Sequence, residues 1–420
     1  MIQTISILPG ITLRCFPDNR FKQGCLSIQL IRPMGTEEAA LNALIPAVLL
    51  RGCDSAPDLR SITLRLDDLY GAAVGALVRR VGDYQTTGLY CGFISDRYAM
   101  DGDAILSPIV EFLGQLLLQP VLEKGVFRKD YVESEKKNLL ATIASQRNDK
   151  RAYAMSQMVK IMCAGDSFGI PRLGEAEQVK KITPKTAYDH YRKILQESRI
   201  EIFYVGEAAP ETVAEKLTGL FAKLERSYVN LPEQTAFCGA PTGEHTEVMD
   251  VAQGKLAMGF VSPVTTRTKD IAAMQVCNAV FGGGMTSKLF MNVREKMSLC
   301  YDISSGYHGA KGIMTVCAGI DCDKMETVRD EILSQLEACR QGDITDEELM
   351  AAKQSLITSL LATHDTPGAI ENFYATAALS GLGMTPAEYI DRVEQVTREQ
   401  VARIAGTLSL NTVYFLKGVS

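Results

Sequence analysis

Histidine is scarce in this sequence, and its scarcity argues against the commonest kind of protein metal centre. The chain of 420 residues contains only His190, His245, His308 and His364. No two of them have the short spacing that lets two imidazoles on one helix face share a metal ion. We therefore expect each histidine to be a surface or partly buried residue, with His190 in a polar stretch of helix.

Paired cysteine motifs, long apolar runs and a basic excess are lacking as well. The eleven cysteines are odd in number and form no C-x-x-C pair, so we expect reduced, mostly buried thiols in a cytoplasmic protein. No apolar run approaches the ~20 residues of a transmembrane helix, and no signal-peptide pattern opens the chain. A net charge of −6 argues against a nucleic-acid binder and a polybasic membrane anchor.

Three consecutive glycines open the most distinctive segment, FGGGMTSKLFMNVREKMSLCYDISSGYH at 281–308. Such a run allows unusual backbone angles and leaves little side-chain bulk. It matches neither G-x-x-x-x-G-K-[ST] nor G-x-G-x-x-G, so a nucleotide site is not expected. The pattern predicts a helix from Lys288 to about Lys296 and a strand from about Tyr301.

The order of periodic segments predicts an α+β protein made of two similar halves. The first half reads as two strands within 10–32, a helix ending near Arg51, a short helix, two strands, a wholly helical stretch at 102–164 and a strand at 200–207. After a segment rich in Pro, Gly, Thr and Glu, the second half repeats this order to its last strand near the chain end. Capping boxes at Thr345 and Thr397 support the helix starts there.

Matching segments recur at offsets of about 212–217 residues, as in ESEKKNLLATI (133–143) and MAAKQSLITSL (350–360). We therefore predict two tandem homologous domains, 1–228 and 247–420, joined by a linker at 229–246. Each is expected to be a mostly antiparallel sheet with helices packed on one face. The two would form a clam with a cleft between them.

The segment 281–308 and the tandem architecture resemble the pitrilysin (insulinase-type) metallopeptidases. The resemblance covers essentially the whole chain and is strongest in that segment. It implies a zinc site in the first domain, built on an inverted H-x-x-E-H helix. Two His at i and i+4 bind the metal there, and the Glu acts as general base.

In this sequence the matching helix is ALIPAVLLRG. Ala43 and Ala47 stand at the two His positions and Pro46 at the Glu position. None of the three can bind zinc or move a proton. Pro46 also lacks an N–H, so we expect it in the first helical turn.

A later helix supplies the third zinc ligand of the family, a Glu, and Glu135 in VESEKKNLL is the best match. A lone carboxylate cannot hold a catalytic zinc. We expect Glu135 to be solvated or paired along its helix, and no metal or other cofactor in this chain.

The resemblance implies a retained substrate-binding half. An Arg and a Tyr seven residues apart bind the substrate backbone in the family, and Arg294 and Tyr301 have that spacing. Gly283 and Gly284 are assigned to the same substrate-binding segment. The alternative is that Arg294 only pairs with a nearby acid and Tyr301 only packs in the sheet.

These features predict a pseudoenzyme, the non-catalytic subunit of a heteromeric zinc metallopeptidase. It would hold an extended peptide against the zinc of a similar-sized partner with an intact H-x-x-E-H motif. The alternative is a homodimeric peptide-binding or chaperone-like protein without proteolysis. A metallopeptidase acting alone is disfavoured, because three ligands and a base are not found. In each case the ligand is an unstructured peptide, with no nucleic acid and no membrane.

Overall fold

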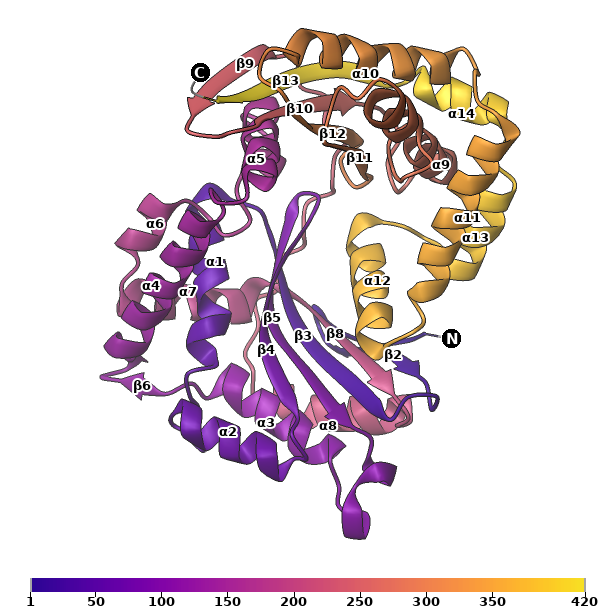
Figure 1. Cartoon of the computed structure of the whole chain (residues 1–420). Helices are drawn as coiled ribbons and strands as arrows, with labels where there is room; N and C mark the ends of the chain where they lie inside the picture. Colours follow the sequence, from indigo (N-terminus) through magenta and orange to yellow (C-terminus); the bar gives the residue numbers. More distant parts are fainter. Residues whose placement is uncertain (1, 419–420) are drawn as a thin grey trace. The chain divides into compact units, whose positions relative to one another are not determined.

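The computed structural model describes residues 2–418, which form two compact units (Figure 1). Unit 1 contains residues 2–143, Ile170–Glu233 and His364–Thr376. Unit 2 contains Ala144–Gly169, Gln234–Thr363 and residues 377–418. Each unit therefore takes one short segment from the half of the chain that otherwise builds the other unit.

Unit 1 is a six-stranded sheet with helices. Its strands follow the order β1-β2-β8-β3-β5-β4, with β1 at Gln3–Leu8, β2 at Ile11–Pro17, β3 at Gln23–Pro33, β4 at Ala73–Val81, β5 at Tyr84–Ile94 and β8 at Arg199–Gly206. Its helices are α1 (Thr36–Leu49), α2 (Leu59–Asp68), α3 (Leu106–Leu118), most of α4 (Lys129–Ser145), α6 (Ala176–Lys181), α7 (Pro184–Glu197) and α8 (Pro210–Phe221), with short 3-10 turns at Asp96–Tyr98 and Met100–Gly102.

Unit 2 is a five-stranded sheet with helices. Its strands follow the order β11-β12-β10-β13-β9, with β9 at Gly243–Met249, β10 at Gly254–Val261, β11 at Asp302–His308, β12 at Ile313–Ile320 and β13 at Ser409–Gly418. Its helical elements are α5 (Lys150–Met162), η3 (Ser167–Gly169), α9 (Ile271–Phe281), η4 (Leu289–Lys296), α10 (Met325–Arg340), α11 (Asp346–Ala362), α13 (Pro386–Glu394) and α14 (Arg398–Ala405).

The two sheets repeat one topology. The order β2-β8-β3-β5-β4 of unit 1 corresponds strand by strand to β9-β13-β10-β12-β11 of unit 2. In both, a single parallel pair, β2 with β8 or β9 with β13, sits at the same place among antiparallel pairs. This agreement confirms the predicted α+β class and the two tandem halves. The capping boxes at Thr345 and Thr397 are also present.

Side-chain alternation separates the two faces of the unit 1 sheet. Leu26, Ile28 and Leu30 of β3 enter the core shared with the helices. Ser27 and Gln29 point to the opposite face, where both donate hydrogen bonds to Glu371 at 2.7 and 2.6 Å.

Glu371 lies on α12 (Pro367–Ser380), whose first part belongs to unit 1. Its carboxylate is completely buried and also accepts two hydrogen bonds from Arg79 of β4, at 3.1 and 3.0 Å. Ile370 packs beside it against Cys25 and Val205. A helix from the second half of the sequence thus covers part of the sheet of the first half.

Helix α5 makes the reciprocal contribution to unit 2. Met158 and Met162 pack over the strands β10 and β13. A Cβ atom on Gly259 of β10 would lie 2.5 Å from the sulfur of Met162 and 2.7 Å from that of Met158. The absence of a side chain at Gly259 lets the helix approach the strand this closely.

The two exchanged helices occupy equivalent places in the repeat. With the offset of 217 that aligns 133–143 with 350–360, Lys150 of α5 aligns with Pro367 of α12. The chain therefore exchanges the same helix in both directions between its two units. The sequence predicts a single boundary at 229–246, whereas the contacts divide after Glu233 and at the ends of these two segments.

Several local expectations are corrected. The 102–164 stretch is interrupted by a small hairpin of β6 (Leu122–Glu123) and β7 (Val126–Phe127). Strand β9 begins at Gly243 and takes the last residues of the predicted linker, including His245. Its polar sequence reads as loop because it is an edge strand with most side chains exposed. Strand β1 has no counterpart among the predicted elements.

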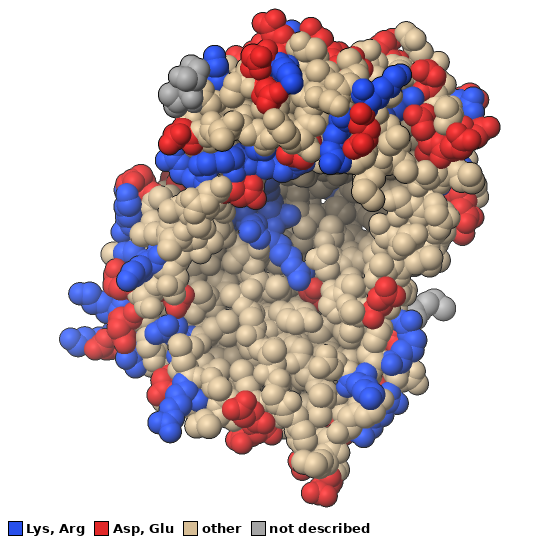
Figure 2. Space-filling model, in the orientation of Figure 1, with Lys and Arg blue, Asp and Glu red and all other residues tan. Residues whose placement is uncertain are grey.

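The surface carries charges of both signs. Figure 2 shows a broad area of uncharged side chains over β3, β4 and β5 of unit 1, with acidic and basic residues gathered around its rim. Nine of the eleven cysteines are buried. Among residues 2–418, no helix combines the length and apolar character needed to cross a membrane.

Candidate functional site

Helix α1 places the three residues that the sequence resemblance matches to the zinc motif in the interior of unit 1. Ala43 is 7% exposed and Pro46 is buried, while Ala47 is half-buried. Methyl groups and a pyrrolidine ring offer no donor atom to a metal. The face of α1 that would hold zinc is therefore chemically inert.

Pro46 is not in the first turn of α1, contrary to the expectation. It is the eleventh of fourteen residues, inside the helix. A proline there cannot donate to the carbonyl four residues earlier, which is that of Asn42. The Thr87 hydroxyl of β5 donates to the Asn42 carbonyl instead, at 2.7 Å. This replacement donor keeps a buried carbonyl satisfied, so the helix tolerates a proline near its end.

Glu135, the matched third ligand, is also committed to protein partners. Its carboxylate lies 3.3 Å from Arg51, just beyond α1, and accepts a hydrogen bond of 3.1 Å from Asn138. Only 11% of its side chain is exposed. Glu135 is therefore neither solvated nor paired only along its own helix, because a guanidinium from another segment neutralises it.

These residues do not fit a zinc ion. Three of the four family positions have no ligand atom, and the fourth is held by Arg51. Among residues 2–418, no group of three or more His, Cys, Asp or Glu side chains could hold a metal. We therefore derive no metal chemistry within this chain.

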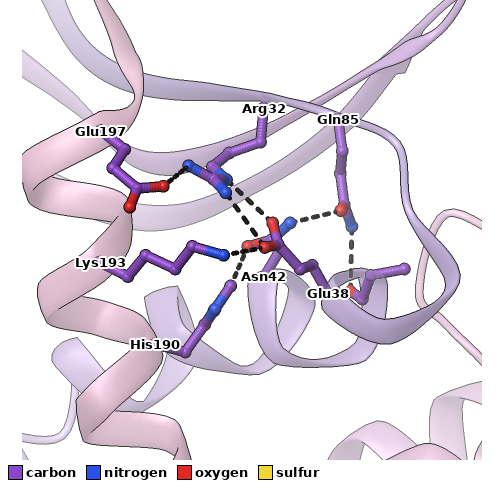
Figure 3. A network of polar contacts seen from close by, with 8 residues as sticks. Arg32, Glu38, Asn42, Gln85, His190, Lys193 and Glu197 are labelled. Atoms are coloured by element: carbon purple, nitrogen blue, oxygen red, sulfur yellow. Dashed lines mark hydrogen bonds and ion pairs between the residues drawn. The ribbon is translucent and has the colours of Figure 1, made fainter. Parts of the chain in front are cut away.

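Asn42 connects α1 to a buried polar network (Figure 3). Its side-chain NH₂ donates to Gln85 at 2.8 Å, and its side-chain oxygen lies 2.7 Å from His190 Nε2. Gln85 then donates to the carbonyls of Ala39 and Arg172, at 3.0 and 2.8 Å. For this series of hydrogen bonds to be complete, the neutral His190 ring must carry its proton on Nε2.

His190 is buried at 7% exposure, whereas the sequence predicted a surface or partly buried residue in a polar stretch of helix. Burial lowers the pKa of His190 to about 4, despite the nearby Glu38 carboxylate. Glu38 itself loses solvation, but hydrogen bonds from Arg32 and Lys193 outweigh this and lower its pKa to about 2. The network thus holds a neutral imidazole beside an ionised carboxylate.

Sequence reasoning missed this network. The available signal was Asn42, the only polar residue between Ala39 and Leu50. A single amide in an apolar helix needs buried partners. Those partners, Gln85 and His190, lie far away in sequence and only the fold brings them together.

The glycine segment joins α9 to the sheet of unit 2. Gly282 and Gly283 both donate to the Asn278 carbonyl at 2.9 Å. A Cβ on Gly283 would lie 2.8 Å from the backbone of Ala279, whereas one on Gly284 would meet nothing within 4 Å. Gly283 is thus required by close packing, and Gly284 faces open space.

The predicted helix after the glycines is a π-helix, η4. Met297 N–H donates to the Asn292 carbonyl five residues earlier, at 3.0 Å. Long π-helices are rare, and π-type turns occur frequently at functional sites. This geometry sets the position of Arg294 near the end of η4.

Arg294 and Tyr301 present their polar groups at the surface of unit 2. The Arg294 guanidinium stacks over Phe290 at 4.5 Å and lies 3.3 Å from Glu295, with 38% of the side chain exposed. Tyr301 is 59% exposed and its hydroxyl donates to Asp321 at 2.9 Å. Tyr301 therefore does not pack in the sheet, although Arg294 does contact an acid of its own helix. The two side chains share no partner among the contacts of residues 2–418.

The hydrogen bond to Asp321 raises the pKa of Tyr301 above its usual value. Tyr301 consequently stays protonated at physiological pH, and its single O–H, which Asp321 accepts here, can donate to a ligand oxygen in place of that carboxylate. Arg294 is always charged and has several N–H donors. Both groups suit carbonyl or carboxylate oxygens.

Comparison with known proteins agrees with this reading of the residues. Residues 181–356 match the family model described as "Peptidase M16 inactive domain". The chain is 29% identical over 409 residues to a "Probable inactive metalloprotease YmfF" of Bacillus subtilis, which covers 97% of this chain and 96% of that protein. It is 24% identical over 291 residues to an "Uncharacterized zinc protease YmxG" of the same organism, covering 68% of this chain and 69% of that protein.

Solved structures extend the similarity to the whole fold. A conserved protein from Enterococcus faecalis superposes with a TM-score of 0.93 at 26% identity, covering 100% of this chain and 99% of that one. A peptidase M16 inactive domain from Pseudomonas fluorescens gives 0.83 at 18% identity, covering 100% and 98%. These similarities identify the chain as a relative of the inactive, pitrilysin-type M16 peptidases.

Proposed function

We propose that this chain is the non-catalytic subunit of a two-chain zinc metallopeptidase. The observation that best supports this proposal is the contrast between the two halves of the chain. The α1 face of unit 1 has no metal ligand, while Arg294 and Tyr301 of unit 2 keep exposed polar side chains. Chemistry would come from the partner's zinc, and this chain would position the peptide.

Extended peptide is the ligand that these donors suit best. A peptide backbone presents carbonyl oxygens at regular spacing, and Arg and Tyr donate to such oxygens. Strand β11 begins next to Tyr301, and it is an edge strand of its sheet. Edge strands accept extended peptides by backbone pairing. On β11 the amide of Ser305 is already bound to the Gly282 carbonyl at 2.8 Å, so an added peptide would pair on either side of that point.

The partner would be a chain of similar fold with an intact motif. Bacillus subtilis offers a precedent for the two kinds of chain in one organism, since it has both an inactive metalloprotease relative and a zinc protease relative. We therefore expect zinc in the partner and none in this chain.

Arg294→Ala tests the positioning role. In the assembled pair we expect kcat/KM for an unstructured peptide to fall about tenfold or more, because removing a charged hydrogen bond costs about 1.5–3 kcal/mol. Tyr301→Phe should lower it by a smaller factor. Lys296→Ala, at an exposed lysine of the same helical segment η4, is the matched control and should leave turnover unchanged. Unchanged turnover in Arg294→Ala would refute the role.

A tagged copy of the chain, purified from its native cells at low salt, identifies the partner. A stoichiometric chain with H-x-x-E-H supports the split enzyme. Recovery of the chain alone, as a homodimer that binds peptides and releases them intact, favours the chaperone-like alternative.

A further inference from the structure

Strand β4 is the outer strand of the unit 1 sheet, and its register shows which backbone groups face outward. It pairs only with β5, through the two-residue turn Gly82-Asp83, in which Gly82 has a φ of 57°. Val81 and Tyr84 flank this turn and form a hydrogen-bonded pair. Backbone groups alternate along a strand, so those of Val78, and of every second residue before it, point away from β5.

A tight loop, Ile170-Pro-Arg-Leu-Gly174, lies beside the hairpin end of β4. Gly174 N–H donates to the Pro171 carbonyl at 2.9 Å, and Gly174 has a φ of 72°. A Cβ there would lie 2.6 Å from the backbone of Ala40 in α1. Only glycine permits both this angle and this approach, so the loop is packed firmly against α1.

The buried network fixes the loop from inside. Gln85 donates to the Arg172 carbonyl at 2.8 Å while it accepts from Asn42. Arg80 of β4 donates to the Ile170 carbonyl at 3.0 Å. The backbone of Arg172 is therefore held by α1, β4 and β5 together.

From this fixed position the Arg172 side chain reaches the outer edge of β4. Its Nη1 donates to the Val78 carbonyl at 2.8 Å. That carbonyl is one of the outward groups that a pairing strand would need. Further along, no contact among residues 2–418 engages the outward backbone groups of Val74 and Ala76.

We propose that Arg172 is a specificity-determining residue that limits peptide addition at β4 to the part of the edge around Val74 and Ala76. This inference rests on the proposed role of the chain in holding an extended peptide. An added strand can pair with Val74 and Ala76 but ends where the guanidinium covers Val78. The edge therefore accepts about four residues and gains nothing from a longer peptide.

The occupant to which the edge is suited is an extended peptide, not a second copy of the chain. The free edge spans only two outward residues, and a stable dimer needs roughly 800 Å² on each partner. Away from the basic side chains near the hairpin end of β4, the surface over β3, β4 and β5 is also largely uncharged (Figure 2), as suits a neutral peptide backbone.

Peptide-length dependence tests the proposal. Fluorescein-labelled peptides of alternating threonine and valine, with four or eight residues between terminal lysines, are titrated against the full chain by fluorescence anisotropy. We expect the wild-type chain to bind both lengths within about twofold. Arg172→Ala should bind the eight-residue peptide about tenfold more tightly and the four-residue peptide as before, since a charge-assisted hydrogen bond no longer competes.

Matched measurements separate the possible outcomes. Arg65→Ala, at an exposed arginine of α2, should behave as wild type. The role of Arg172 in limiting peptide length is refuted, and the proposed function is left intact, if the wild-type chain already prefers the longer peptide tenfold or if Arg172→Ala shows no length preference. If neither chain binds a peptide of either length, both this role and the proposed function are refuted. The role is also refuted if Arg172→Ala dimerises with increasing concentration without binding peptide more tightly, because the freed edge then pairs with a second copy of the chain.

Discussion

His190 is the residue whose chemistry the fold changes most. In sequence it lies in the polar run Asp189-His-Tyr-Arg-Lys, but in the structure it faces α1 and hydrogen-bonds Asn42. Burial keeps the ring neutral, with a pKa of about 4. The imidazole, a common metal ligand in other proteins, is here a hydrogen-bond donor in a structural network.

This shift predicts a pH dependence of stability. The folded-state pKa of about 4 lies below the unfolded value of 6.5, so the unfolded state takes up the proton first as pH falls. Stability is therefore complete above pH 6.5 and declines from there toward pH 4, by about 3 kcal/mol in all. Urea unfolding at pH 7 and pH 4.5 measures it.

His190→Gln is the control for this titration, because glutamine can donate to Asn42 but does not titrate. Its free energy of unfolding should fall less between pH 7 and pH 4.5 than that of wild type. The Glu38 carboxylate has a lowered pKa, so its contribution persists above its unfolded value of 4.5 and is lost only below it. Equal pH dependence in both chains would contradict the assignment.

At the scale of the element, α1 shows how a helix accommodates an internal proline. Pro46, which the sequence resemblance matches to the family's general base, removes an N–H inside the helix. Thr87 from the neighbouring strand compensates at the Asn42 carbonyl. The hydrogen bond from Thr87 to the Asn42 carbonyl therefore links α1 to β5. A helix without an internal proline would satisfy this carbonyl by itself and would not need the link.

Thr87→Val should therefore destabilise the chain by about 1–3 kcal/mol, the cost of leaving a buried acceptor unsatisfied. The same change in a Pro46→Ala background should cost clearly less, because an alanine in place of the proline restores the N–H that the carbonyl lacks. The four proteins form a double-mutant cycle measured by urea unfolding. Additive effects would show that Thr87 does not substitute for the missing donor.

The whole molecule is linked by the reciprocal exchange of α5 and the first part of α12. Glu371 of α12 is buried in unit 1, and Met158 and Met162 of α5 are buried in unit 2. Each sheet therefore needs a helix that the other half of the sequence supplies. We expect the two units to unfold together, although their cores are separate.

Glu371→Ala tests this coupling. Removing one partner of a buried ion pair costs about 3–5 kcal/mol. Hydrogen exchange as a function of urea should show β3 and β5 of unit 1 losing protection at a lower concentration, and β10 and β13 of unit 2 losing it at that same concentration.

Glu394→Ala, at an exposed glutamate at the end of α13, should leave both transitions in place. If Glu371→Ala lowered the urea concentration at which protection is lost only for β3 and β5, the two units would unfold independently. The exchanged helices would then contribute packing but no coupling between the units.

The residue pattern was sufficient for much of this description. Apolar periodicity located most strands and helices, because a buried face repeats every two or 3.6 residues. The offset of about 217 gave the tandem repeat. Ala43, Pro46 and Ala47 sufficed to predict the loss of the zinc motif, because ligand chemistry is a property of the side chain itself.

What the sequence could not give depends on contacts between distant residues. Sequence periodicity assigns α5 and α12 as helices, but only tertiary packing decides that each covers the sheet of the other half. The pairing of Thr87 with α1 at Pro46, of Asn42 with His190, and of Arg172 with the β4 edge joins positions that lie far apart in the sequence. Local pattern carries no signal for such pairs, because each side chain is ordinary in its own segment and acquires its role from the partner that the fold brings to it.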